Sequence, residues 1–406
     1  MNRIIGISIG ILLLAALAGG TWYFFFSSAP TESPANPEGG FGTSPLQTVD
    51  VTPTVENAGE GTSNTSINIS QQKVFRVEDG PIVGATVVQT FRPTTTLARY
   101  VQQNNGHVFD LTLDSSGAVP KAISNTTIPG ITRALWTKQG QGVILQYLDS
   151  NTVKSVSLSF PSQTASTTQP VGIRFLPDGI YDVAVSPNGA NIAYLLRTQT
   201  GVKGYLAAAD GTGSRELFTL PLSEVVLLWP SPTTLLAHTK SAYGAPGIAF
   251  SINVSSGSVV TLIHASSLTL TADPVYSYLV YQTLGEGSTP TTYVRTLSTG
   301  QNTSLSFNPH PERCLWSSVA TSTMYCATPM EYTPANYLDL WHAGSATAPE
   351  GLVAYTFPGG RSSILAIPGK DEGGITSTID SISTSPDEKY LLFVRRGDRS
   401  LWGVRL

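Results

Sequence analysis

The sequence contains little cysteine, little histidine and little charge, and each shortage excludes a class of protein. Of 406 residues, 2 are cysteine and 5 are histidine, too few for a disulfide-rich scaffold or a cluster of zinc ligands. The histidines show no spacing typical of metal ligands, so we expect no metal site and no cofactor. Charged residues make up 12% of the chain and the net charge is −4, which is unfavourable for a partner such as nucleic acid.

The residues that are abundant point to strands and turns. Hydrophobic residues make up 41% of the chain, enough for a large core, and there are 38 glycines and 27 prolines. After residue 73, short runs rich in Val, Ile, Thr and Tyr alternate with turn residues, with almost no helical periodicity. This pattern predicts an all-β fold.

The N-terminal segment has the features of a membrane anchor. Residues 4–26 form an uncharged run of 23 residues that ends in Trp22, Tyr23 and three phenylalanines. As a helix this run is about 35 Å long, enough to cross a hydrocarbon core of about 30 Å. Arg3 precedes the run and no Lys or Arg follows it before Lys73. This asymmetry predicts a cytoplasmic N-terminus and an extracytoplasmic remainder.

A cleaved signal peptide is the alternative interpretation of this segment. Ala16-Leu17-Ala18 fits a small-residue cleavage site. The apolar run continues past it to Phe26, which favours the uncleaved anchor. Under either interpretation the rest of the chain is exported.

We predict three regions in the chain. Residues 1–26 form the anchor and residues 27–72 form a linker rich in Ser, Thr, Pro and Gly, which contains five acidic residues and no basic one. Such a composition is typical of a disordered linker. Residues 73–406 form the folded domain, with 22 basic and 22 acidic residues. This balance predicts no electrostatic steering of a highly charged partner.

The folded domain is built from repeats. Sets of strands begin near residues 82, 131, 180, 224, 268, 311 and 378, so five intervals are 43 to 49 residues long and the sixth is 67. Periods of this size, with several strands in each, are typical of β-propeller blades. We predict a β-propeller of seven blades, with six or eight as alternatives, and an insertion around Pro329 to Pro349 in the long interval.

The ends of the domain predict how the ring closes. The last set has three strands and stops at Leu406, whereas Lys73-Val74-Phe75-Arg76-Val77 lies ahead of the first set. We expect this N-terminal strand to pair with the final three strands, because that pairing removes an exposed sheet edge.

One repeat contains a specific turn motif. The turn Ser186-Pro187-Asn188-Gly189 lies between a strand with Asp182 and one with Tyr194. Proline at the second position and glycine at the fourth favour a tight reversal. The sequence around this turn resembles the WD-repeat-like motif of TolB-type β-propellers.

The resemblance covers residues 180–220 and 379–406. In the second stretch Glu388 replaces the turn glycine, and Asp380 lies one residue further from its proline than Asp182 does. The resemblance implies a bacterial envelope or secreted protein whose propeller serves as an interaction platform.

The two cysteines flank a predicted turn. Cys314 and Cys326 are 12 residues apart, so on paired strands they would face each other. A structural disulfide and two unbonded thiols are both consistent with this spacing, because a disulfide requires a narrow range of Cβ separations.

The sequence favours a binding function. No stretch combines a nucleophile elbow with the helices of a hydrolase domain, so we expect that the protein is not an enzyme. Our main hypothesis is a membrane-anchored extracytoplasmic module that binds a protein or a glycan at the cell envelope. Loops on a rigid scaffold commonly bind ligands, and the insertion supplies the candidates Tyr332, Tyr337, Trp341 and His342.

Two other hypotheses remain open. The first is a propeller glycosidase or lyase with carboxylates at the central channel, and the second is a structural envelope component. Carboxylates or histidines grouped at one channel mouth would favour an enzyme, whereas an exposed aromatic patch would favour a binding module.

Overall fold

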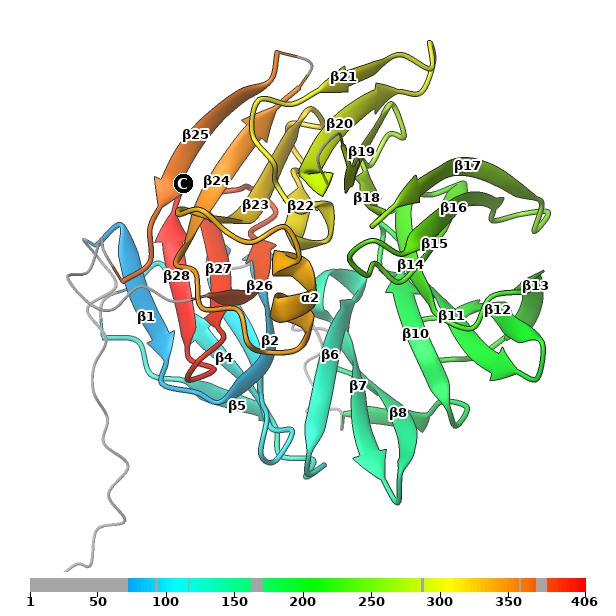
Figure 1. The fold of residues 1–406 in the computed structure, drawn as a ribbon. Coiled ribbons are helices and arrows are strands. Elements are labelled where there is room, and N and C mark those ends of the chain that lie inside the picture. Colours follow the sequence, from blue (N-terminus) through cyan, green and yellow to red (C-terminus); the bar gives the residue numbers. More distant parts are fainter. Residues whose placement is uncertain are drawn as a thin grey trace, which may run out of the picture. The chain divides into compact units, whose positions relative to one another are not determined.

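The structure, a computed structural model, describes residues 72–91, 94–115, 117–161, 171–285, 288–357, 359–369 and 378–406. These residues form seven four-stranded antiparallel sheets around a central channel (Figure 1). The predicted all-β propeller is therefore confirmed, with seven blades. The predicted anchor at residues 4–26 and nearly all of the linker lie outside the described residues. Among the described residues, no helix is long and apolar enough to cross a membrane.

Six blades consist of four consecutive strands, and the first strands β2, β6, β10 and β22 line the cavity in the channel. Blade 1 contains β2 (Ile82–Phe91), β3 (Thr94–Gln102), β4 (Val108–Thr112) and β5 (Lys121–Ser124). Blade 2 contains β6 (Ile131–Thr137), β7 (Gly142–Asp149), β8 (Thr152–Ser159) and β9 (Gly172–Phe175). Blade 3 contains β10 (Ile180–Val185), β11 (Asn191–Thr198), β12 (Gly201–Ala208) and β13 (Arg215–Leu220). Blade 4 contains β14 (Val225–Ser231), β15 (Thr234–Thr239), β16 (Pro246–Asn253) and β17 (Val259–Ser266). Blade 5 contains β18 (Thr269–Ala272), β19 (Tyr278–Leu284), β20 (Pro290–Thr296) and β21 (Asn302–Ser304). Blade 6 contains β22 (Cys314–Trp316), β23 (Thr323–Pro329), β24 (Glu350–Thr356) and β25 (Arg361–Ala366).

Blade 7 closes the ring with both ends of the domain. It contains β26 (Ile379–Thr384), β27 (Tyr390–Arg395), β28 (Leu401–Arg405) and, at its outer edge, β1 (Val74–Glu78). Phe75 pairs with Gly403 and Arg76 with Trp402 in the antiparallel register of β1 and β28. The predicted pairing of the N-terminal strand with the last sheet is confirmed.

The described residues include three short helices between strands, η1 (Lys138–Gly140), η3 (Pro311–Arg313) and α2 (Tyr337–His342). The last of these lies in the predicted insertion, between β23 and β24. We refer to residues 330–349 as the insertion.

The core is divided among the contacts between neighbouring blades. Seven clusters of buried apolar side chains occur among the described residues, and each combines residues of two adjacent blades. The middle strands are buried on both faces, as in β27, where Tyr390 to Val394 are all buried. Burying one such side chain stabilises the fold by about 1.5 to 3 kcal/mol. Stability thus depends on every blade having both of its neighbours.

The motif turn of blade 3 is shaped by its contact with blade 2. Gly189 has a φ of 68°, which is unfavourable for other residues, and its carbonyl accepts a hydrogen bond from the Lys138 amide at 2.9 Å. A Cβ atom on Gly189 would lie 2.2 Å from the Lys138 nitrogen. The close approach of the two blades therefore requires glycine at this position.

Glu388 occupies the equivalent position in blade 7 and compensates for its backbone with its side chain. Its φ is 52°, yet its carboxylate accepts hydrogen bonds from the Ser317 hydroxyl at 2.6 Å and the Tyr325 hydroxyl at 2.9 Å. These bonds connect blade 7 to blade 6. The departure from the turn motif has thus a structural role.

The structure joins Cys314 and Cys326 by a disulfide. The two residues are direct partners on β22 and β23, with Cα atoms 4.1 Å apart. The bond links the channel-lining strand of blade 6 to the next strand outwards.

We expect Phe75→Ala to destabilise the whole domain, because Phe75 is buried in the cluster between blades 7 and 1. Its ring fills the space beside Gly403 and meets Tyr390 edge to face, with ring centres 6.2 Å apart. The expected loss is about 3 to 5 kcal/mol of unfolding free energy, measured by urea denaturation. The matched control is Phe175→Ala on the outer strand β9, where the residue is 72% exposed. Equal effects of the two substitutions would contradict the importance of ring closure.

Candidate functional site

A cavity of about 660 Å³ occupies the central channel. Its walls come from the inner strands β2, β6, β10, β22 and β26. The side chains that line it include Arg133, Trp136, Asp380 and Arg399. Charged and aromatic groups from blades far apart in the sequence therefore face one space.

One end of the channel, which we call the insertion-side mouth, is partly covered by the insertion. The strand β26 begins at this end, and the inner strands of the other blades begin there too because all blades have the same topology. The Trp341 indole of α2 donates a hydrogen bond to the carbonyl of Ile379, the first residue of β26, at 3.4 Å. A second cavity of about 210 Å³ lies beside Trp341 and is also lined by Glu312 and Asp380. Asp380 lines both cavities, which places them next to each other.

Two ion pairs lie at this mouth. An Nη1 atom of Arg133 is 2.5 Å from Asp182, whose other oxygen accepts a hydrogen bond from the Leu227 amide at 2.8 Å. Arg399 contacts Asp380 at 2.6 Å. The Arg133 side chain is 44% exposed. Both guanidinium groups are thus held in place, and that of Arg133 is open to solvent.

Glu312 and His342 form a third pair. The Glu312 carboxylate, at the end of blade 5, lies 3.2 Å from Nε2 of His342 on α2. Burial alone would raise the pKa of Glu312, but the hydrogen bond from His342 and the nearby histidines lower it overall. Glu312 is therefore ionised near neutral pH and favours the imidazole tautomer that carries its proton on Nε2.

A buried salt bridge anchors the insertion beneath these groups. Arg313 and Glu350 contact each other through two hydrogen bonds of 2.7 and 2.9 Å, with side chains 2% and 0% exposed. Glu350 also accepts hydrogen bonds from the Tyr337 hydroxyl and the Ile379 amide. Removing one partner would leave the other as an unpaired buried charge, at a cost of about 3 to 5 kcal/mol.

The Trp341 ring contacts two guanidinium groups. The Arg313 and Arg396 groups are 4.2 and 4.4 Å from the centre of its ring. Contacts of this kind stabilise by about 0.5 to 2 kcal/mol each. They hold α2 over the mouth.

Two further histidines are buried near Glu312. His310 donates from Nδ1 to Gln282 at 2.8 Å, and its ring stacks on Tyr337. Burial, together with the charge of Arg313, lowers the pKa of His310 to about 4. Burial likewise lowers the pKa of His238. Both rings are therefore neutral near pH 7.

The four candidate residues of the insertion are placed in three different environments. Tyr332 is 96% exposed and lines a groove between blades 5 and 6. Tyr337 is buried against His310 and Glu350. Trp341 and His342 lie at the insertion-side mouth. They do not form one continuous aromatic surface.

Glu312, Arg313 and His310 were not among the candidates predicted from the sequence. These residues form the segment His310-Pro311-Glu312-Arg313 directly before β22. Three titratable residues within four positions, in a chain of low charge, were the feature of the sequence that could have revealed this segment.

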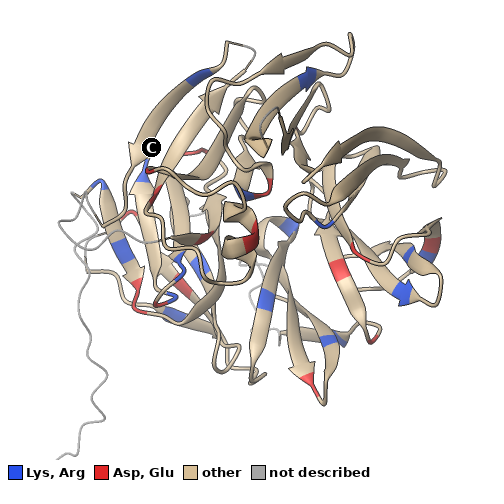
Figure 2. Ribbon diagram, viewed as in Figure 1, with Lys and Arg blue, Asp and Glu red and all other residues tan. Residues whose placement is uncertain are grey.

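The described residues contain no group of three or more His, Cys, Asp or Glu side chains arranged to hold a metal ion. Basic and acidic residues are interspersed across the blades (Figure 2).

Comparison with known proteins shows similarity of fold. No protein-family model matches the sequence, and no curated protein matches it. An oligogalacturonate lyase solved in complex with manganese is similar in structure, with a TM-score of 0.52 and 12% identity, over 83% of this chain and 98% of the lyase. The oligogalacturonate lyase of Vibrio parahaemolyticus has a TM-score of 0.53 and 10% identity, over 83% of this chain and 92% of that chain. TolB from Acinetobacter baumannii has a TM-score of 0.40 and 12% identity, over 79% of each chain.

These comparisons overturn the expectation that the protein is not an enzyme. The two lyases share its fold over 83% of its length. The expectation rested on a missing serine nucleophile, but an elimination reaction requires a base and no nucleophile of that kind. The absence of a nucleophile elbow argued against a serine hydrolase mechanism but not against catalysis in general.

We expect His310 to make stability depend on pH. Between pH 6.5 and about 4 the unfolded chain binds a proton at this residue that the folded protein does not, so stability falls as the pH falls through this window. The contribution lost between pH 7 and pH 5 is about 2 kcal/mol. Urea denaturation at pH 7 and pH 5 should show a smaller difference in unfolding free energy for His310→Gln than for the wild type. The control is His264→Gln at an exposed position, and an unchanged difference in His310→Gln would contradict the prediction.

Proposed function

We propose that the protein is a lyase that cleaves an oligosaccharide containing uronic acid units at the insertion-side mouth. The observation that carries the proposal is the grouping of Glu312–His342, Asp380–Arg399 and Asp182–Arg133 at one end of the channel. Such a group was the feature expected of an enzyme and not of a simple binding module. The likeness in fold to two oligogalacturonate lyases supports the same class.

The site offers the groups that an elimination needs. A base removes the proton next to the substrate carboxylate, the electron pair forms a C=C bond, and the bond to the leaving oxygen breaks as that oxygen takes up a proton from water. We assign the base to His342, whose Nε2 faces Glu312 and whose Nδ1 is then left with a lone pair. The manganese of the structurally similar lyase does not fit the described residues, since no group of potential ligands is present among them.

The substrate carboxylate would bind a guanidinium group in the channel. Arg133 and Arg399 line the cavity. Each guanidinium has five N–H donors, more than its hydrogen bonds to Asp182, Val183 or Asp380 use. A cation close to the carboxylate stabilises the charge that develops on it as the proton is removed.

Incubation with uronic acid oligosaccharides tests this proposal through the ultraviolet absorbance of the unsaturated product. We expect His342→Gln to lower kcat by about 100-fold or more, as is typical for the loss of a general base. Glu312→Gln should also lower kcat, because it removes the carboxylate that orients the imidazole.

The matched control is Glu216→Gln, since Glu216 forms an exposed pair with Lys203 on the outer strands of blade 3. It should retain the wild-type rate. Absence of an unsaturated product with every uronic acid substrate, or full activity of His342→Gln, would contradict the proposal.

Glycan binding without cleavage is the second candidate. The exposure of Tyr332 on a groove favours it, because exposed aromatic rings stack on sugar rings. Saturable binding of a glycan that is recovered intact would support this candidate over the lyase.

We further propose that residues 4–26 anchor the protein in a membrane, with the propeller outside the cytoplasm at a bacterial cell envelope. The uncharged run, its aromatic end and the lack of Lys or Arg before Lys73 support this placement. The intact protein should stay in the membrane fraction after alkaline extraction, and external protease should degrade the propeller. Release with a new N-terminus after Ala18 would instead support a cleaved signal peptide.

A further inference from the structure

We propose that the groove beside Tyr332 is a second sugar subsite, which binds a neutral hexose unit of the oligosaccharide and takes no part in cleavage. This inference rests on the proposed function, and it adds a binding position separate from the insertion-side mouth. The groove has a volume of about 320 Å³ and lies between β20 of blade 5 and β23 of blade 6, with the insertion as its third side. This volume falls within the range of small-molecule sites.

His310 supplies a hydrogen-bond acceptor at the base of the groove. The Gln282 amide nitrogen donates to the Pro309 carbonyl at 3.4 Å, so its oxygen faces His310 and accepts from Nδ1. Nε2 of His310 then carries a lone pair, and among the described residues it has no hydrogen-bond partner. Because the ring is neutral near pH 7, this nitrogen can accept a hydrogen bond from a sugar hydroxyl.

Asn308 supplies donors in the same groove. Its side-chain oxygen accepts a hydrogen bond from the Thr292 amide at 3.0 Å, which fixes the amide orientation and leaves the NH₂ group as the donor. Thr328 also lines the groove, with its hydroxyl 3.1 Å from the Tyr355 hydroxyl. An acceptor and donors at fixed positions are the groups that recognise sugar hydroxyls.

The remaining walls are mostly apolar and contain one charged residue. Tyr332 and Phe307 provide rings, and three prolines, Pro290, Pro329 and Pro334, provide further apolar surface. Glu331 is the one charged side chain among the residues that line the groove. This lining would repel a carboxylate and suits a neutral sugar, whose apolar ring face stacks on an aromatic ring.

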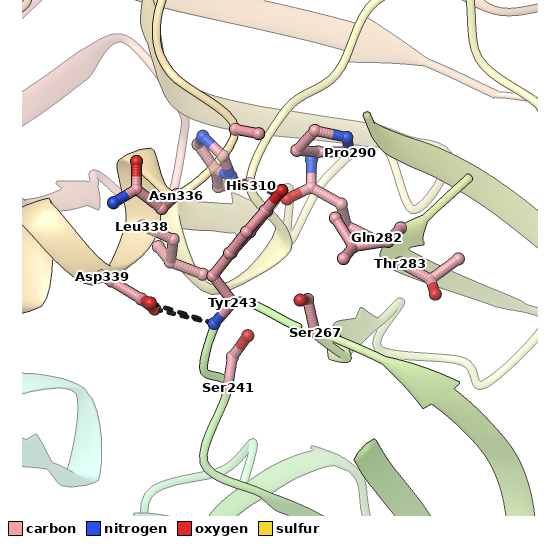
Figure 3. Close-up of a pocket in the computed structure, with 12 residues that line it drawn as sticks. Ser241, Tyr243, Ser267, Gln282, Thr283, Pro290, His310, Asn336, Leu338 and Asp339 are labelled. Carbon is pink, nitrogen blue, oxygen red and sulfur yellow. Dashed lines mark hydrogen bonds between the residues drawn. The ribbon is translucent and has the colours of Figure 1, made fainter. Parts of the chain in front are cut away.

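A contact between the insertion and blade 4 lies beside the groove. The Asp339 carboxylate accepts hydrogen bonds from the Tyr243 amide at 3.0 and 3.2 Å (Figure 3). Only about 20 Å³ of space remains there, lined by Tyr243, Gln282 and His310. The sugar therefore enters from the side of Tyr332.

The segment from His310 to Glu312 separates the two sites. His310 lines the groove, whereas Glu312 lines the cavity beside Trp341. The groove should therefore affect the affinity for the oligosaccharide, and so KM, while leaving kcat unchanged.

Isothermal titration of the full chain in detergent with maltose, cellobiose and lactose tests the proposal. We expect at least one of these neutral sugars to bind, Tyr332→Ala to weaken that binding about tenfold, and Tyr332→Phe to retain it, because the ring and not the hydroxyl makes the stacking contact. Phe175→Ala on β9 is the control for loss of an exposed aromatic ring and should bind as the wild type does.

Glu312→Gln separates this proposal from the lyase proposal. It should lower kcat for cleavage of uronic acid oligosaccharides but leave the titration with neutral sugars unchanged. Failure to bind any of the three sugars, or equal affinity in Tyr332→Ala and the wild type, would overturn the subsite even if cleavage is observed.

Discussion

The pairing of β1 with β28 is the interaction on which the rest of the structure depends. It supplies the fourth strand of blade 7 and connects the two ends of the domain. Each blade buries its apolar residues against two neighbours, so a blade that lost one neighbour would expose one of these faces. Closure therefore makes seven weakly stable sheets into one cooperative domain.

The candidate site depends on the same closure. Arg133, Glu312 and Asp380 come from three different regions of the chain, and only the ring brings them to one mouth. The insertion then completes the site, because the buried Arg313–Glu350 pair and the stacked Trp341 hold α2 in place. A buried ion pair of this kind adds little net stability, and we infer that its role here is to specify the position of the insertion.

The fold could be predicted from the sequence because its determinants are local and repeated. The spacing of the strand sets predicted the blades, and the turn at Ser186 to Gly189 predicted a strand reversal. The site could not be predicted in this way, since its side chains lie on separate blades and are related only by the ring. Glu312 lies in the short helix η3, outside the periodicity of the strands. The conformation of Glu388 is explained by contacts with blade 6 that the sequence does not reveal.

Native-state hydrogen exchange of the β1 amides tests ring closure most directly. If closure holds the domain together, the hydrogen-bonded amides of β1 should exchange only through global unfolding, with the same free energy as those of the buried strand β27. Exchange of β1 at a much lower free energy, while β27 stays protected, would show that the propeller persists without this strand and would contradict the account.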